Sequence, residues 1–210
     1  MQDKNSDRNQ RKRLTRERLM DAALTLMSQG HSFPSVSLRE ITREAGVVPT
    51  AFYRHFADLD ALGLALMAEC GDALRALLRD ARAGQVLQNR DLRVPLRWFW
   101  QYARANPLPL RALVSERNGG AASLRRALRD ELALLARELA QDLRHAGFCS
   151  ELPLPQLEMI AALMLDTLLG AVSDILDLPD DQVQPARELE QRLTDQMRVI
   201  VLGARQWRRS

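Results

Sequence analysis

The sequence has 210 residues, of which 46% are hydrophobic, and its formal net charge is +3. This length suits one large domain or a small domain followed by a larger one, and the apolar fraction is enough for a substantial core. The first residues are polar, and acidic residues interrupt the longest apolar run, near residues 157–176, so we expect no signal peptide, no membrane insertion and a cytoplasmic location.

The sequence has no pattern typical of a catalytic, cofactor or metal site. Cys70 and Cys149 lie far apart, and His31, His55 and His145 lack the spacing that places metal ligands on one helical face. Neither a GxSxG nucleophile motif nor a glycine-rich phosphate loop occurs. We therefore expect a protein that is not an enzyme and that binds neither a metal nor a cofactor.

The first predicted helix runs from about residue 11 to about residue 29 and ends because Gly30 follows. Positive charge at the start of a helix opposes the macrodipole, and contact with DNA phosphates would compensate for this cost. We predict that Arg11, Lys12 and Arg13 contact DNA, whereas the alternative is a solvated, partly disordered arm. The basic residues at this end are Arg11, Lys12, Arg13, Arg16 and Arg18.

Residues 37–56 have the pattern of two short helices joined by a turn. Ser37 and Glu40 form a capping box, so the first of these helices begins at Ser37, and Gly46 ends it. Helical spacing predicts a buried face and a solvent face for this helix. The buried face comprises Leu38, Ile41 and Ala45, and the solvent face comprises Arg39, Thr42 and Arg43.

The second helix of the pair is predicted over residues 48–56, with proline tolerated in its first turn. Val48, Phe52 and Phe56 are spaced four residues apart and form its predicted core face. The other side chains suit a DNA major groove and its phosphate walls. The predicted DNA contacts of the two helices are Ser37, Arg39, Pro49, Thr50, Ala51, Tyr53, Arg54 and His55. An ordinary helical hairpin with a solvated outer face is the alternative.

Beyond Phe56 the pattern is helical throughout, which predicts an all-α fold. We expect a small N-terminal three-helix domain with the helix-turn-helix, residues 1–57, and a larger C-terminal helical bundle, residues 58–210. Asp58 can cap the first helix of this bundle. Capping residues, glycines and prolines predict the helices 59–83, 92–106, 110–116, 123–145, 155–176 and 185–207.

The last two predicted helices are apolar around much of their circumference, which favours contact with both their own core and a second subunit. Buried helices of a monomer are the alternative. A homodimer would place two recognition helices about one DNA turn apart, ~34 Å, and would therefore bind a double-stranded operator with pseudo-palindromic symmetry.

The segment from about Arg11 to Gly63 resembles the DNA-binding domain of the TetR family of bacterial transcriptional repressors. The family's hallmark after the turn is an aromatic pair, a variable residue and His-Phe, which residues 52–56 match. Val48 and Thr50 depart from the wider family, in which many members have serine and glycine at these positions.

More narrowly, residues 37–64 resemble the subgroup that represses unsaturated fatty acid synthesis and desaturation in response to acyl-CoA. Further matches are Asn106, Pro107, Arg111, Leu113, Glu116, Arg117, Gly119, Met197, Arg198, Gly203, Trp207 and Arg208. The resemblance implies a homodimeric repressor of lipid genes with a four-helix dimer interface. It also implies that the C-terminal bundle binds a long-chain acyl-CoA as effector.

By this likeness the acyl chain would occupy a tunnel in the bundle, with its phosphates near basic side chains at the mouth. The candidate ligand-binding residues are Trp98, Phe99, Met164 and Leu168 for the chain and Arg97, Arg111 and Arg117 for the mouth. The same residues could equally fill a close-packed core or carry surface charge.

Two other functions are possible for this sequence. A TetR-like repressor of an efflux system would respond to drug-like molecules, and buried carboxylates in its pocket would favour cations. A helical lipid carrier or acyl-transfer enzyme would lack salt-dependent affinity for DNA.

Overall fold

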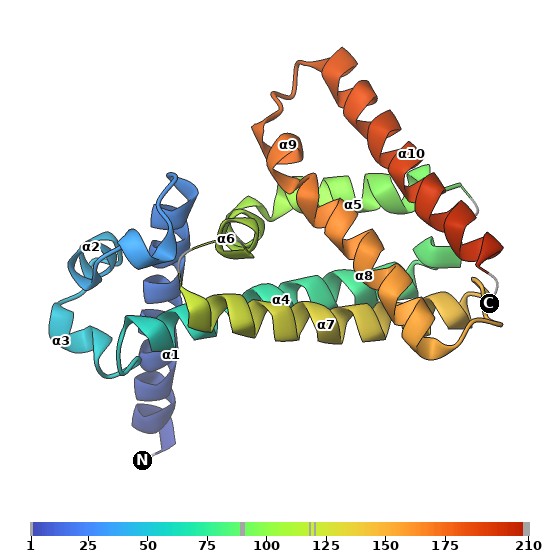
Figure 1. Cartoon of the computed structure of the whole chain (residues 1–210). Coiled ribbons are helices and arrows are strands. Elements are labelled where there is room, and N and C mark those ends of the chain that lie inside the picture. The colour runs from blue at the N-terminus through green and yellow to red at the C-terminus, as the bar shows by residue number, and fades with distance from the viewer. Residues whose placement is uncertain (1, 89–90, 118, 120, 208–210) are drawn as a thin grey trace.

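The computed structural model describes residues 2–88, 91–117, 119 and 121–207. Within these ranges the protein is helical and has no strand, which confirms the predicted fold class. Figure 1 shows a small group of N-terminal helices beside a larger helical bundle. Arg208, one of the residues in the subgroup resemblance, lies outside the described residues.

The N-terminal group begins with a helix that is longer than the sequence predicted. This helix, α1, starts at Gln2 instead of near residue 11, because its polar first turns contain no glycine or proline. Arg11 and Asp7 form an ion pair of 2.8 Å at i,i+4 spacing across this region. The elements of the group are α1 (Gln2–Ser28), η1 (Phe33–Ser35), α2 (Leu38–Glu44) and α3 (Pro49–Phe52).

The bundle helices lie close to their predicted positions. Asp58 caps α4, its Oδ1 accepting a hydrogen bond of 2.8 Å from the Ala61 N–H, as the sequence predicts. A short 3-10 turn, η2, follows α4. The elements are α4 (Leu59–Ala83), η2 (Val86–Gln88), α5 (Arg93–Ala105), α6 (Pro107–Arg117), α7 (Ala122–His145), α8 (Leu154–Gly170), α9 (Val172–Asp177) and α10 (Val183–Gln206).

The predicted helix 155–176 is two helices, because the chain turns at Ala171. The Ala171 N–H donates to the Leu168 carbonyl at 3.1 Å, an i→i+3 bond that tightens the last turn of α8. The span 154–177 is long and apolar enough to cross a bilayer. However, it packs against α7 and α10, and its Asp166 forms an ion pair of 2.5 Å with Arg117. These features are typical of a core helix in a folded domain.

One hydrophobic core connects the N-terminal group with the bundle. Along the bundle, α4 packs side by side with α7, and α7 packs against α8, as Figure 1 shows. Each large side chain that is fully buried stabilises the fold by roughly 1.5–3 kcal/mol. The fully buried residues of the bundle include Leu62, Leu66, Met67, Leu113, Leu124, Leu128, Leu157, Ile160 and Leu169.

Phe33 joins the helix-turn-helix to the bundle. Its backbone N–H donates to Oε1 of the fully buried Glu116 on α6, at 2.9 Å. Its ring lies against Gly63 on α4, where a Cβ atom would be 2.6 Å from Phe33 Cε1 and 2.9 Å from Leu124 Cδ2. A glycine is therefore required where η1, α4 and α7 meet.

We predict that Glu116→Ala lowers the free energy of unfolding by about 1–3 kcal/mol, because the buried Phe33 N–H loses its acceptor. Glu116→Gln keeps an acceptor oxygen for the Phe33 N–H, so it should lower the free energy of unfolding clearly less than Glu116→Ala. Urea unfolding followed by circular dichroism measures both. Equal losses for the two variants would show that this hydrogen bond does not hold the junction.

Candidate nucleic-acid interface and ligand cavity

The capping box predicted at the start of α2 is present. Ser37 Oγ accepts from the Glu40 N–H at 3.3 Å, and Glu40 Oε2 accepts from the Ser37 N–H at 2.8 Å. Ser37 Oγ also donates to Glu40 Oε2 at 2.7 Å, and these hydrogen bonds lower the pKa of Glu40. The Ser37 hydroxyl, a predicted DNA contact, is therefore already engaged within the helix cap.

The two faces of α2 follow the prediction at most positions, although Leu38, predicted to be buried, is half-buried. Ile41 and Ala45 are buried, and Arg39 is exposed. Thr42, predicted to face solvent, is only 2% exposed. Its Oγ1 donates to the Arg39 carbonyl at 3.3 Å, so its polar atom is satisfied while its methyl group can pack inward.

Gly46 forms the turn between α2 and α3 with a φ of 63°, in the left-handed region that favours glycine. The guanidinium of Arg18 from α1 lies beside it, with Nη2 3.0 Å from the position that a Cβ atom would take. The Val47 N–H donates to the Thr42 carbonyl at 2.9 Å, and this hydrogen bond closes the turn. These contacts hold the turn against α1.

The recognition helix is shorter than the predicted 48–56. It ends at Phe52, after which the Arg54 N–H donates to the Ala51 carbonyl at 3.3 Å and the His55 N–H to the Phe52 carbonyl at 2.8 Å, both i→i+3 bonds. The Phe56 N–H then donates to the same Phe52 carbonyl at 3.0 Å. Val48, predicted to be in the core, is 64% exposed. It precedes the helix in an extended conformation and makes no side-chain cap.

Two buried aromatic side chains anchor this short helix. Phe52 and Phe56 are buried, with ring centroids 5.7 Å apart. The Arg16 guanidinium lies over the Phe56 ring at 4.5 Å, a cation–π contact that ties α1 to this segment. Tyr53 meets Phe52 edge to face yet is 63% exposed, so the segment after Phe52 points away from the core.

The other predicted DNA-contacting residues lie at the surface. Ala51 and His55 are half-buried. The exposed ones are Arg11, Lys12, Arg13, Ser37, Arg39, Pro49, Thr50, Tyr53 and Arg54. Arg11 and Arg13 form exposed ion pairs with Asp7 and Glu17. Such pairs contribute little to stability, so these side chains can exchange a carboxylate for a phosphate at low cost.

Basic side chains of α1 lie near the end of the recognition segment, by which we mean residues 48–56. Burial lowers the pKa of His55, and the charges of Lys12, Arg16 and Arg54 lower it further. We define the basic cluster as His55 together with the three residues whose charges act on it, namely Lys12, Arg16 and Arg54. Arg16 is not among the DNA contacts predicted from the sequence, and only its packing on Phe56 reveals its place in the cluster.

A cavity of about 820 Å³ opens within the bundle, between α4, α5, α7, α8 and α10. This volume lies in the range of small-molecule sites. Four predicted ligand-binding residues line it, namely Trp98, Phe99, Met164 and Leu168.

The predicted arginines lie elsewhere. Arg111 is paired with Asp177 at 2.7 Å and Arg117 with Asp166 at 2.5 Å, and neither lines the cavity. The prediction that they flank its mouth is therefore not supported, because each already has a carboxylate partner on a neighbouring helix. Instead the cavity is lined by two arginines of α10 that sequence reasoning missed, Arg198 and Arg205.

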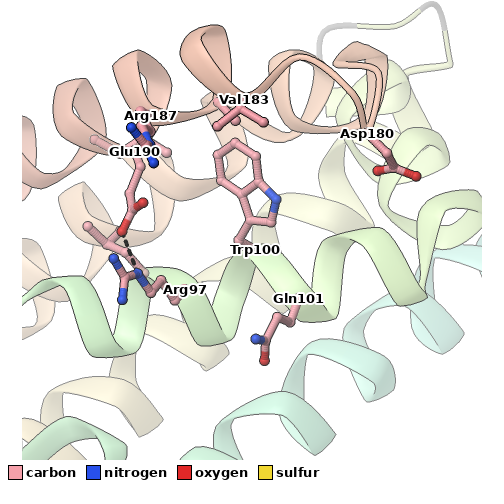
Figure 2. Close-up of a pocket in the computed structure, with 10 residues that line it drawn as sticks. Arg97, Trp100, Gln101, Asp180, Val183, Arg187 and Glu190 are labelled. Carbon is pink, nitrogen blue, oxygen red and sulfur yellow. Dashed lines mark hydrogen bonds and ion pairs between the residues drawn. The ribbon is translucent and has the colours of Figure 1, made fainter.

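Arg97 belongs to a second, smaller pocket of about 330 Å³ between α5 and α10. Its Nε donates to Glu190 Oε1 at 2.6 Å. Figure 2 shows this pair beside Trp100, whose indole points toward Val183 on the facing helix. Leu96 lines both pockets, so they lie along the same α5–α10 groove.

Apolar side chains are also exposed on α8 and α10, which contact each other. We define the exposed apolar patch as Met159 and Leu163 on α8 with Val199 and Leu202 on α10. Val199 is 71% exposed, although α10 is otherwise amphipathic. Exposed apolar side chains on two helices in contact are typical of a protein interface.

Residues 19–66 match the model of the bacterial regulatory proteins of the tetR family. The whole fold is similar to solved structures. The fatty acid degradation regulator FadR from Bacillus halodurans has 15% identity and a TM-score of 0.64, with 90% of this chain and 95% of that chain covered.

A transcriptional regulator from Rhodococcus sp. Rha1 has 24% identity and a TM-score of 0.62, with 90% of this chain and 96% of that one covered. A putative transcriptional regulator from Pseudomonas aeruginosa PAO1 has 24% identity and a TM-score of 0.61, with 95% of both chains covered. The matched N-terminal segment, the capped helix-turn-helix and the helical bundle are thus all similar to those of TetR-family DNA-binding transcriptional regulators.

Proposed function

We propose that this protein is a homodimeric repressor of lipid genes, in particular those for unsaturated fatty acid synthesis and desaturation. In this proposal residues 1–57 bind the operator in the cytoplasm, residues 58–210 bind the effector and form the dimer, and a long-chain acyl-CoA sets the affinity for the operator. The observation that carries the proposal is an exposed helix-turn-helix joined through one core to a largely apolar cavity.

The recognition segment offers two kinds of DNA contact. Thr50, Ala51 and Arg54 would reach base edges in the major groove. Tyr53, His55 and the α1 arginines would position the protein on phosphates. The basic cluster supports this division, because it gathers positive charge from α1 and from the recognition segment at one place.

Arg54→Ala should reduce the preference for operator over random duplex by roughly 1–3 kcal/mol, as expected for loss of a guanidinium that reads a guanine. His55→Ala should instead weaken binding to both duplexes alike. The measurement is the affinity of each variant for an operator selected from random duplexes and for a scrambled version. Equal losses on both duplexes for Arg54→Ala would contradict its role in base recognition.

The exposed apolar patch supports a dimer formed by α8 and α10 of each protomer. Isolated exposed apolar residues are common in monomers, but four on two adjoining helices favour a self-complementary interface. Such a dimer would hold its two recognition segments about 34 Å apart, the spacing needed to bind the two halves of a pseudo-palindromic operator.

Val199→Glu should raise the dimer dissociation constant at least roughly 100-fold, because an unpaired charge buried in an interface costs several kcal/mol. Val183→Glu is the matched control, since Val183 is also exposed on α10 but lies outside the patch. Sedimentation velocity over a concentration series measures both. Dissociation by both substitutions or by neither would rule out this interface.

The cavity supports an apolar chain as ligand. No aspartate or glutamate lines it among the described residues. A cationic drug would need such a compensating charge. The cavity therefore favours a lipid effector over the cationic ligands expected of an efflux regulator.

Palmitoyl-CoA and oleoyl-CoA should change the operator affinity of the wild type, and they should do so to different extents if saturation is sensed. Leu168→Trp fills part of the cavity and should abolish the response while leaving the affinity without ligand unchanged. A gel-shift titration measures both, with tetraphenylphosphonium as a cationic comparison. No effect of either acyl-CoA would exclude the proposed ligand and leave the DNA-binding role intact.

A further inference from the structure

The large cavity is charged on one wall only. Among the described residues that line it, the charged ones are Arg198 and Arg205, both on α10. They are seven residues apart, two turns of the helix, and share the cavity face with Met197 and Val201. The remaining lining is almost entirely apolar, with Gln88 as a further polar side chain.

The two arginines differ in their partners. Arg198 Nη1 donates to Asp195 Oδ1 at 2.6 Å, so its charge is partly neutralised. Arg205 makes no ion pair or side-chain hydrogen bond with any described residue. Among the described residues that line the cavity, Arg205 is thus the arginine without a carboxylate partner.

Arg205 also lies toward the connection between α7 and α8. Burial raises the pKa of the Cys149 thiol and the charge of Glu151 raises it too, whereas the charge of Arg205 lowers it. Gly147 and Phe148, in the same connection, line the cavity. Arg205 therefore lies at the side of the cavity that is formed by the connection between α7 and α8.

We propose that Arg205, assisted by Arg198, binds the anionic head group of the effector, so that the cavity selects anionic long-chain amphiphiles over neutral and cationic ones. This inference rests on the proposed function, because it assumes that the cavity is the effector site. The apolar wall takes the chain, and the guanidinium makes charge-assisted hydrogen bonds to a carboxylate or phosphate. The carboxylate would come from a free fatty acid, and the phosphate from the CoA part of a thioester.

A purely structural role for Arg205 makes different predictions. It lies in the last turn of α10, where a positive charge interacts favourably with the helix dipole. In that role its loss would lower thermal stability and would affect all ligands alike. If Arg205 binds the head group, its substitution should instead reduce the affinity for anionic ligands more than the affinity for neutral ones.

The test compares three ligands with the same chain, oleate, oleoyl-CoA and oleyl alcohol, by isothermal titration below their aggregation limits. Arg205→Gln should weaken binding of at least one anionic ligand by roughly 10-fold to 100-fold, while oleyl alcohol changes less than about 3-fold. Arg205→Lys should retain most of the preference for the anion. Arg129→Gln is the matched control, since Arg129 is exposed on α7 and does not line the cavity.

A loss confined to oleoyl-CoA identifies the head group as phosphate, and one confined to oleate identifies it as carboxylate. If Arg205→Gln weakens the binding of all three ligands equally, or of none of them, the proposed role of Arg205 is wrong, while the lipid effector stays in place. If the wild type binds none of the three, the proposed ligand itself is wrong. Melting temperatures of the variants show whether each is folded.

Discussion

Phe33 is the contact on which the position of the helix-turn-helix depends. Its amide is fixed to the buried carboxylate of Glu116 on α6, and its ring fills the space left by Gly63 on α4. Among the described helices, α1 also joins the helix-turn-helix to the bundle, because it packs against α6 and α4. In the proposed function, a movement of α6 or α4 would therefore reach the recognition segment through Phe33 and through α1, since packed interiors deform little.

The features of the fold that could be predicted from the sequence are those decided by neighbouring residues. The capping box of Ser37 and Glu40, the left-handed turn at Gly46 and the cap at Asp58 each follow from local hydrogen bonding or a single backbone angle. Prediction from the sequence failed where tertiary packing decides. Thr42 is buried by contacts that its helical position does not reveal, and the recognition helix ends early, at Phe52, where i→i+3 bonds follow.

The same distinction applies to the functional residues. Bulky apolar side chains such as Trp98 and Met164 could be placed inside the helical bundle from the sequence, but only the structure shows that they line a cavity instead of filling a close-packed core. Charged residues could not be assigned, since their role depends on which partner is within reach. Arg117 and Asp166 are 49 positions apart in the sequence yet form an ion pair, whereas Arg205 faces the cavity only because α10 crosses the bundle there.

One helix connects the cavity to the junction at Phe33. The second half of α4 lines the cavity with Leu74, Leu77 and Leu78, and its first turns hold Gly63 against Phe33. A ligand can change operator affinity only if it binds one arrangement of these helices better than another. Because α4 is continuous from Leu59 to Ala83, an arrangement of α4 that widened the cavity would also move the surface that Phe33 contacts. In the proposed function, α4 would therefore be the element that links effector binding to DNA binding.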